Sequence, residues 1–122
     1  MESGKDKLIP WRQEVAAAAH SKMRDGPWKV PVQVSCTFFF PRPKAHFGTG
    51  RNAETLRPSA PKRPAGKPDI DKLVRAVLDA MTGIVFSDDS QVVALDAMKL
   101  YADMETPGVT VDCRALVPDF EF

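Results

Sequence analysis

The 122-residue sequence has few of the residues that build metal or disulfide frameworks. It contains two histidines and two cysteines, Cys36 and Cys113, which lie far apart and form no Cys-x-x-Cys spacing. This composition argues against a zinc site of the usual cysteine–histidine type. Each cysteine falls in an alternating apolar segment, so buried free thiols in a reducing compartment are favoured over the alternative, a disulfide.

The sequence also lacks a long apolar run. No stretch approaches the roughly 20 residues of a membrane span. The first residues, MESGKDKLIPW, lack the apolar core of a signal peptide. We therefore expect a cytoplasmic protein. A length of 122 residues with 43% hydrophobic residues is typical of one globular domain, 1–122, with a core of its own.

A strong overall charge is missing as well, since the formal net charge is +1. The charge is unevenly distributed, because residues 41–67 carry seven basic residues and one acidic residue. This segment has no periodicity and is rich in proline and glycine, which predicts a long loop. A solvated linker is one interpretation, but a loop that binds the DNA backbone is favoured because it ends beside an acidic segment. The candidate DNA contacts are Arg42, Lys44, Arg51, Arg57, Lys62, Arg63, Lys67 and, just beyond the loop, Lys72.

The apolar pattern predicts two helices and three strands. Helices are expected over 10–24 and 70–81, and strands over 30–40, 91–101 and 109–117. Gly83 is placed to end the second helix in the left-handed conformation. This order of elements predicts an α/β (α+β) fold, in which a small mixed or antiparallel sheet carries helices on one side.

Two pairs of aspartates flank the second predicted helix. Asp69 and Asp71 stand at its start, and Asp88 and Asp89 follow it in the sequence SDDS. Each aspartate alone could be a helix cap or a turn residue. One cap explains only one member of a pair, so a shared site is the competing interpretation. Because the helix is about 18 Å long, the pairs meet only if GIVF (83–86) returns the chain towards the helix start.

Convergence of these carboxylates would predict a specific chemistry. Carboxylates in close contact repel one another unless a cation neutralises them. Oxygen ligands without histidine or cysteine favour Mg²⁺ or Mn²⁺, which can activate water and stabilise a leaving oxygen. A carboxylate site beside a basic loop therefore predicts a nuclease that cleaves phosphodiesters. Arg75, one turn after Asp71, could orient that aspartate or stabilise the charge of the phosphate; an ion pair with Asp71 or Asp79 is the alternative.

The segments around the aspartates resemble the RusA family of Holliday junction resolvases of phages and prophages. The matching sequences are PDIDKL (68–73), VRAVLDAMTG (74–83) and DDSQV (88–92). The loop sequence from 42 to 69 and the sequence LIPWRQEV (8–15) also resemble members from actinobacteria and their phages. The resemblance therefore covers nearly the whole chain.

The resemblance implies a function and a set of site residues. Asp69, Asp71 and Asp89 would bind the metal, with Asp88 nearby as a fourth carboxylate, and Arg75 stands where the family usually has a catalytic lysine. The implied protein is a small α/β homodimer that resolves four-way junctions in DNA recombination and repair, with Mg²⁺ (or Mn²⁺) as cofactor.

Two further expectations come from the same resemblance. His46 lies in the basic loop at a position that the similar sequences share, which suggests a DNA contact. Family members usually begin with a β-hairpin before the PWR segment, whereas nine residues precede Pro10 here. The hairpin is thus expected to be missing, and a module that binds branched DNA without cutting it is the alternative function.

Overall fold

The structure, a computed structural model, describes the backbone of residues 4–116. Two helices and three strands follow one another, and short 3-10 helices precede α2 and β2. They are α1 (Gly4–Lys22), β1 (Val32–Phe40), η1 (Lys44–His46), η2 (Gly50–Asn52), α2 (Ile70–Met81), η3 (Asp89–Gln91), β2 (Val92–Tyr101) and β3 (Gly108–Ala115).

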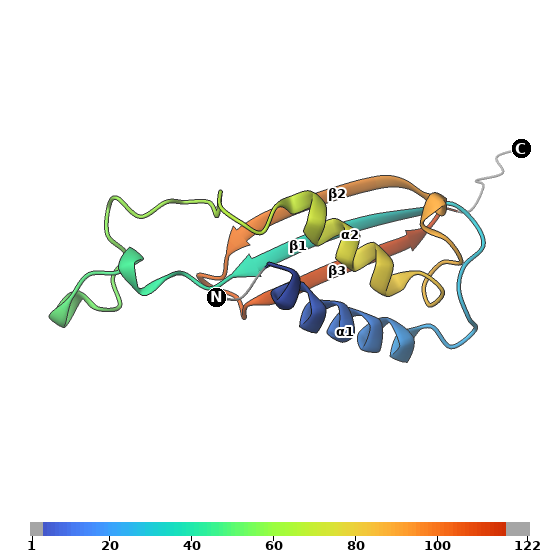
Figure 1. Cartoon of the computed structure of the whole chain (residues 1–122), viewed down its shortest axis with the longest axis horizontal. Coiled ribbons are helices and arrows are strands. Elements are labelled where there is room, and N and C mark those ends of the chain that lie inside the picture. Colours follow the sequence, from blue (N-terminus) through green and yellow to red (C-terminus); the bar gives the residue numbers. More distant parts are fainter. Residues whose placement is uncertain (1–3, 117–122) are drawn as a thin grey trace, which may run out of the picture.

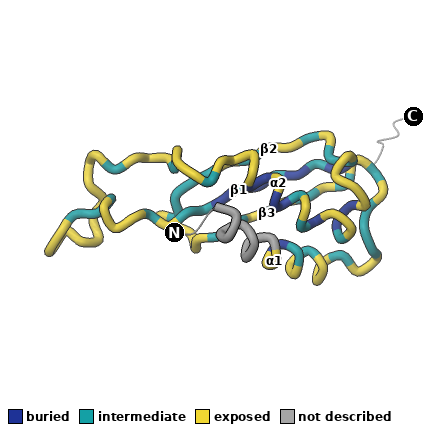
Figure 2. The backbone as a smooth tube through the Cα atoms, viewed as in Figure 1, coloured by how far each residue is buried: buried dark blue, intermediate teal, exposed yellow. Residues whose placement is uncertain are grey.

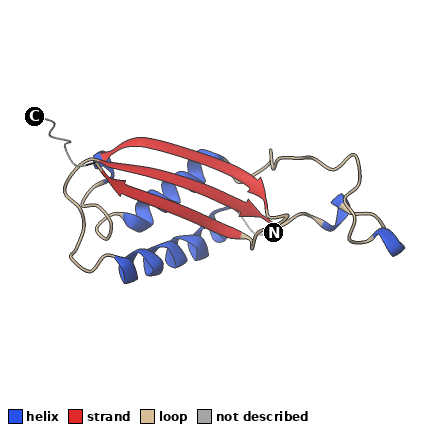
Figure 3. Ribbon diagram, turned by 180° about the vertical axis from the view of Figure 1, so that it is seen from behind, coloured by secondary structure: helices blue, strands red, loops and turns tan. Residues whose placement is uncertain are grey.

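The strands form one mixed sheet in the order β2-β1-β3. The central strand, β1, pairs in parallel with β2 and antiparallel with β3. Both helices lie over the same face of this sheet, as the opposite views in Figures 1 and 3 show. The predicted α+β architecture, a small mixed sheet with helices on one side, is confirmed. Within residues 4–116, no helix is long and apolar enough to cross a membrane.

The core lies between the sheet and the helices. Every second residue of β1 from Val32 to Phe38 is buried, because successive side chains of a strand point to opposite faces. The predicted apolar stripe of α2 packs on this face through Leu73, Val74 and Val77. Figure 2 shows that the buried residues are concentrated along β1 and the facing side of α2. The alternating apolar residues of β1 and the apolar stripe of α2 therefore pack against each other in one core.

The element boundaries differ from the sequence expectation in several places, among them the end of α1 at Lys22 and the start of β1 at Val32. Helix α1 begins at Gly4, well before Pro10, so the proline lies inside the helix. A proline there removes one backbone hydrogen bond, and the lysine and leucine residues before it are good helix formers. Gln91 belongs to η3, so β2 begins one residue later than expected, at Val92. The last strand ends at Ala115, and residue 117 of the predicted strand lies outside the described residues.

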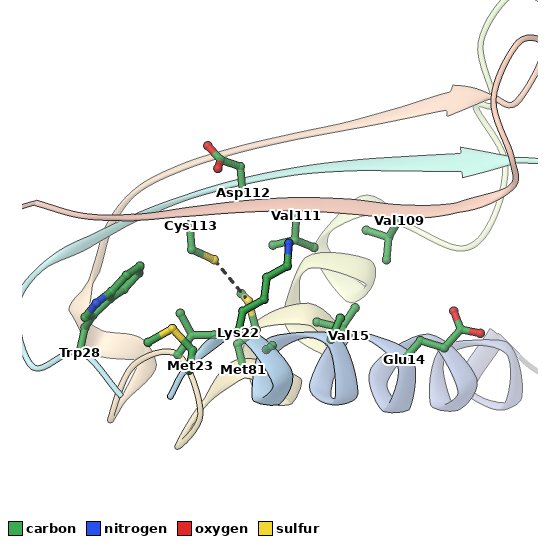
Figure 4. A pocket seen from close by; sticks show the side chains of 13 residues that line it. Glu14, Val15, Lys22, Met23, Trp28, Met81, Val109, Val111, Asp112 and Cys113 are labelled. Carbon is green, nitrogen blue, oxygen red and sulfur yellow. Dashed lines mark hydrogen bonds between the residues drawn. The ribbon is translucent and has the colours of Figure 1, made fainter. Parts of the chain in front are cut away.

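The two cysteines are free thiols, as predicted. Burial is the main cause that raises the pKa of both Cys36 and Cys113 to about 11. Cys113 lines a pocket of about 590 Å³ between α1 and β3, where its sulfur lies 3.4 Å from the sulfur of Met81 (Figure 4). None of the predicted site residues lines this pocket.

Candidate active site

The first aspartate pair lies exposed at the N-terminal end of α2. Asp69 is the N-cap residue, and its backbone carbonyl accepts a hydrogen bond from the Leu73 N–H. An aspartate at this position usually caps the helix through its side chain, but the carboxylate of Asp69 makes no such bond. Asp71 follows in the first turn. The cap interpretation therefore does not account for either carboxylate, although the positive end of the helix dipole stabilises both.

Lys99 of β2 holds the segment that leads into α2. Its ammonium donates hydrogen bonds to the carbonyl oxygens of Gly66, at 2.6 Å, and Pro68, at 2.9 Å. The same nitrogen lies 5.7 Å from the centroid of the Phe40 ring, at the end of β1. These contacts attach the residue before Asp69 to the rigid sheet. The first carboxylate pair is therefore held near the C-terminal ends of β1 and β2.

Arg75 follows Asp71 by one helical turn and is exposed. Among the side chains that the structure describes, those of residues 13–116, ion pairs join Arg42 to Asp103 and Arg114 to Asp112, and none joins Arg75 to Asp71. The interpretation of Arg75 as a simple partner of Asp71 is therefore not supported, and its charge faces solvent beside the first aspartate pair.

The two aspartates of the second pair, Asp88 and Asp89, have different roles. One carboxylate oxygen of Asp88 accepts a hydrogen bond from the Ser90 N–H at 3.1 Å, and the Asp88 N–H donates to the side chain of Gln91 at 2.9 Å. The two bonds form a capping box at the start of η3. Hydrogen bonds from Ser90, through its side chain and then its backbone, lower the pKa of Asp88. Asp88 thus has a structural role, whereas the exposed Asp89 has no part in the box.

Gln91 fixes η3 to the chain that enters β1. Its side-chain amide donates to the carbonyl oxygens of Trp28, at 2.9 Å, and Val30, at 2.8 Å. Because β1 and β2 are parallel, both begin at this end of the sheet. Asp89 is therefore held at the N-terminal ends of the two strands.

The two pairs consequently lie at opposite ends of α2 (Figure 1). After the helix, Gly83 takes the predicted left-handed conformation, with φ of 84°, and its N–H donates to the carbonyl of the fully buried Phe86 at 2.7 Å. The segment 83–86 thus closes a tight turn and does not return to the helix start. Along β2, the seven residue steps from Val92 to Lys99 span roughly 20 Å. The segment 83–86 therefore does not bring the two pairs together within one chain.

This separation decides whether one chain can supply the metal site that the sequence suggests. No group of three or more His, Cys, Asp or Glu side chains is placed to hold a metal ion among the described residues. Asp69 and Asp71 lie at one end of α2 and Asp89 at the other. The set of three carboxylates therefore does not fit a single metal ion within one chain.

The basic segment 41–67 extends away from one end of the sheet (Figure 1). It is an irregular loop, as predicted, but it has internal structure. The Gly48 N–H donates to the carbonyl of Thr55 at 2.9 Å, and Arg57 donates from its N–H to His46 at 2.9 Å and from its side chain to Phe47 at 2.7 Å. These bonds fold the outer part of the loop, including η1 and η2, back on itself.

Arg42 anchors this loop to the end of β2. Its guanidinium makes two hydrogen bonds to Asp103, at 2.6 and 3.1 Å, and a third to the carbonyl of Pro61 at 2.6 Å. The same group stacks 4.1 Å from the centroid of the Tyr101 ring, and the Arg42 side chain is 6% exposed. The hydrogen bond to Arg42 lowers the pKa of Asp103. Arg42 is thus positioned to stabilise the loop rather than to meet a ligand.

The other cations of the loop differ in exposure. His46 is half-buried, makes an edge-to-face contact with Tyr101 at 5.4 Å and lies 3.3 Å from the Arg42 guanidinium, so it belongs to the same anchor. The remaining candidates for DNA contacts are exposed on the loop or on the first turn of α2. They are Lys44, Arg51, Arg57, Lys62, Arg63, Lys67 and Lys72.

Sequence reasoning missed the residues that position this site. Lys99 carries a signal, because it is a single lysine in the otherwise mostly apolar strand sequence VVALDAMKLY. The partners of Arg42, Asp103 and Tyr101, carry none, since they lie far from it in the sequence.

Comparison with known proteins adds a family assignment to this geometry. The family described as "Endodeoxyribonuclease RusA" matches residues 4–114, which include both aspartate pairs and the whole basic loop. A relative from Bacillus subtilis (strain 168), "Uncharacterized protein YqaN", is 33% identical over 104 residues, which cover 85% of this chain and 71% of that protein.

Proposed function

This chain belongs to the RusA endodeoxyribonuclease family, whose members resolve Holliday junctions, and from this premise we propose that it cuts four-way and other branched DNA as a metal-dependent homodimer. One observation carries the proposal. The carboxylates of Asp69 and Asp71 are exposed at a fixed helix start, directly after the basic loop, and Asp69 does not cap the helix.

The basic loop is proposed to bind the DNA backbone. Its exposed lysines and arginines lie on an extension that reaches beyond the sheet, and this extension ends at Lys67, two residues before Asp69. Contacts between such side chains and phosphates position a duplex without reading its sequence. The loop would therefore deliver a phosphodiester to the first aspartate pair.

The residues beside this pair suit a phosphate. Lys72 and Arg75 are exposed on the first turns of α2 and would neutralise charge on the bound phosphodiester. An arginine stays charged at every relevant pH, so Arg75 would stabilise charge but would not transfer a proton. Carboxylate oxygens prefer hard cations, and we propose Mg²⁺, with Mn²⁺ as a substitute, as the cofactor that the aspartates bind.

The test is cleavage of a synthetic four-way junction in the presence of Mg²⁺. Asp71→Asn removes a carboxylate charge without changing the size of the side chain. We expect it to lower the cutting rate about 100-fold or more, because even groups outside the first ligand shell of a metal site are worth roughly 10- to 100-fold.

The matched control is Asp112→Asn, the same change at an exposed residue of β3 outside the proposed site. It should cut at the wild-type rate. Equal cutting by Asp71→Asn and Asp112→Asn would refute the proposal. Junction binding by the wild-type protein without metal-dependent nicking would indicate a binding module instead.

A further inference from the structure

We infer that the tip of the basic loop places the Arg51 side chain in the minor groove of a DNA arm, with a preference for A·T-rich sequence. The inference rests on the proposed function and goes beyond it, because contacts to phosphates alone would give the loop no preference between duplex sequences. A contact inside a groove makes the affinity depend on the sequence of the arm.

The outer part of the basic loop is folded into a short ribbon of two antiparallel segments. The Gly48 N–H donates to the carbonyl of Thr55 at 2.9 Å, and Phe47 and Leu56 form an antiparallel bridge. We call residues 47–56 the finger. Because these contacts join its two sides, the finger holds its tip in a fixed place relative to its own base.

The tip of the finger is a narrow turn. The Asn52 N–H donates to the carbonyl of Thr49 at 3.0 Å, so the chain reverses its direction within the short helix η2. Gly48 lies so close to this turn that a Cβ atom at position 48 would be 2.7 Å from the Cβ of Asn52. The tip sequence TGRNA (49–53) contains one long side chain, that of Arg51, and the other residues are small.

Arg51 differs from the two arginines that hold the loop together. The guanidinium of Arg42 is bound to Asp103. The side chain of Arg57 donates to the carbonyl of Phe47 at 2.7 Å. Arg51 is exposed, and among the side chains of residues 13–116 it takes part in no hydrogen bond and no ion pair. Its guanidinium is therefore available to a ligand at the end of the finger.

The shape of the tip favours the minor groove. This groove is about 6 Å wide in B-DNA, against about 12 Å for the major groove, so it admits one arginine side chain but not the whole ribbon behind it. A·T-rich sequence narrows the groove and strengthens its negative potential, which attracts an arginine. A guanidinium is also more weakly hydrated than the ammonium of a lysine, so it loses less on leaving water. A single arginine at a narrow tip is therefore suited to an A·T-rich minor groove.

The finger would meet the DNA away from the cutting site. Figure 1 shows the basic loop extending beyond one end of the sheet, whereas Asp69 and Asp71 lie at the start of α2. The base of the loop is held at the end of β2 by Arg42 and its partner Asp103. The Arg51 contact is therefore expected on a duplex arm and not at the phosphodiester that is cut, so it contributes to the affinity for the junction.

The test compares two four-way junctions that share one branch point and differ in their arms, which are A·T-rich in one junction and G·C-rich in the other. Binding is measured by fluorescence anisotropy without divalent metal, so that no strand is cut. The wild type should bind the A·T-rich junction about 10-fold more tightly, the size of one good contact to base edges. Arg51→Ala should lose this preference, and Arg51→Lys should lose most of it, because lysine keeps the charge but is more strongly hydrated.

The matched control is Arg63→Ala, which removes the same charge from an exposed position of the basic loop outside the finger. It should weaken binding to both junctions by the same factor. Netropsin, which occupies the minor groove of A·T-rich DNA, should reduce the affinity of the wild type for the A·T-rich junction to that of Arg51→Ala. Equal affinity of the wild type for both junctions, a preference that Arg51→Ala retains, or no effect of netropsin would overturn the inference. Failure of the wild type to bind either junction, or to cut it with Mg²⁺, would instead refute the proposed function.

Discussion

The two aspartate pairs around α2 look alike in the sequence but differ in structure. At the helix start, Asp69 occupies a capping position and does not use its carboxylate to cap. At the other end, Asp88 forms a complete capping box and leaves Asp89 exposed. Position in the sequence therefore does not separate a structural aspartate from a functional one. The separating observation is whether the carboxylate satisfies the backbone N–H groups that follow it.

The largest expected contrast lies between the neighbouring residues Asp88 and Asp89. Asp89→Asn should lower the rate of junction cutting about 100-fold or more, as expected for a group that binds the metal. Asp88→Asn should cut at close to the wild-type rate, because asparagine caps a helix as well as aspartate does. The measurement is the single-turnover rate on a four-way junction with Mg²⁺. Equal rates for the two variants would remove the distinction between the residues.

A smaller effect is expected on thermal stability, where Asp88 should matter more than Asp89. Asp88→Ala removes the capping box and should lower the melting temperature by a few degrees, whereas Asp89→Ala should change it little. Asp88→Asn keeps the cap and is the matched control. Thermal unfolding followed by circular dichroism provides the comparison, and a lower melting temperature for Asp89→Ala than for Asp88→Ala would contradict the assignment of the cap.

The difference in stability between wild type and Asp88→Ala should also depend on pH. The pKa of Asp88 is lowered from its ordinary value of 3.8 by the hydrogen bonds from Ser90. A carboxyl group with a lowered pKa stabilises the folded state above its unfolded pKa, and this contribution is lost as the pH falls through the folded value. The gap between wild type and Asp88→Ala should therefore be constant at neutral pH and shrink below pH 3.8. The gap between Asp88→Asn and Asp88→Ala should persist, because asparagine does not titrate.

Much of the fold could be predicted from the sequence because its pattern is local. The alternation of β1 and the apolar stripe of α2 directly specify which faces meet in the core. Gly83 ends the helix in the conformation that glycine favours. The start of α1 at Gly4 was missed, because Pro10 is equally compatible with a first turn and, at some cost, with a helix interior.

The candidate site was less predictable because its determinants are distant in the sequence. The anchoring of the basic loop depends on the contact of Arg42 with Asp103, 61 residues away. The distance between the aspartate pairs depends on the turn after α2, whose buried Phe86 fixes its direction. A sequence identifies the four carboxylates, but the rigid elements between them decide whether they share one chain.

The most direct test of the account is the rate at which Asp69→Asn cuts a four-way junction with Mg²⁺. Asparagine suits the first position of a helix as well as aspartate does, so this change keeps the start of α2 and removes only the carboxylate charge. Asp69→Asn should cut about 100-fold or more slowly than wild type, whereas Asp112→Asn on β3 should cut at the wild-type rate. Equal rates for the two variants would contradict the account.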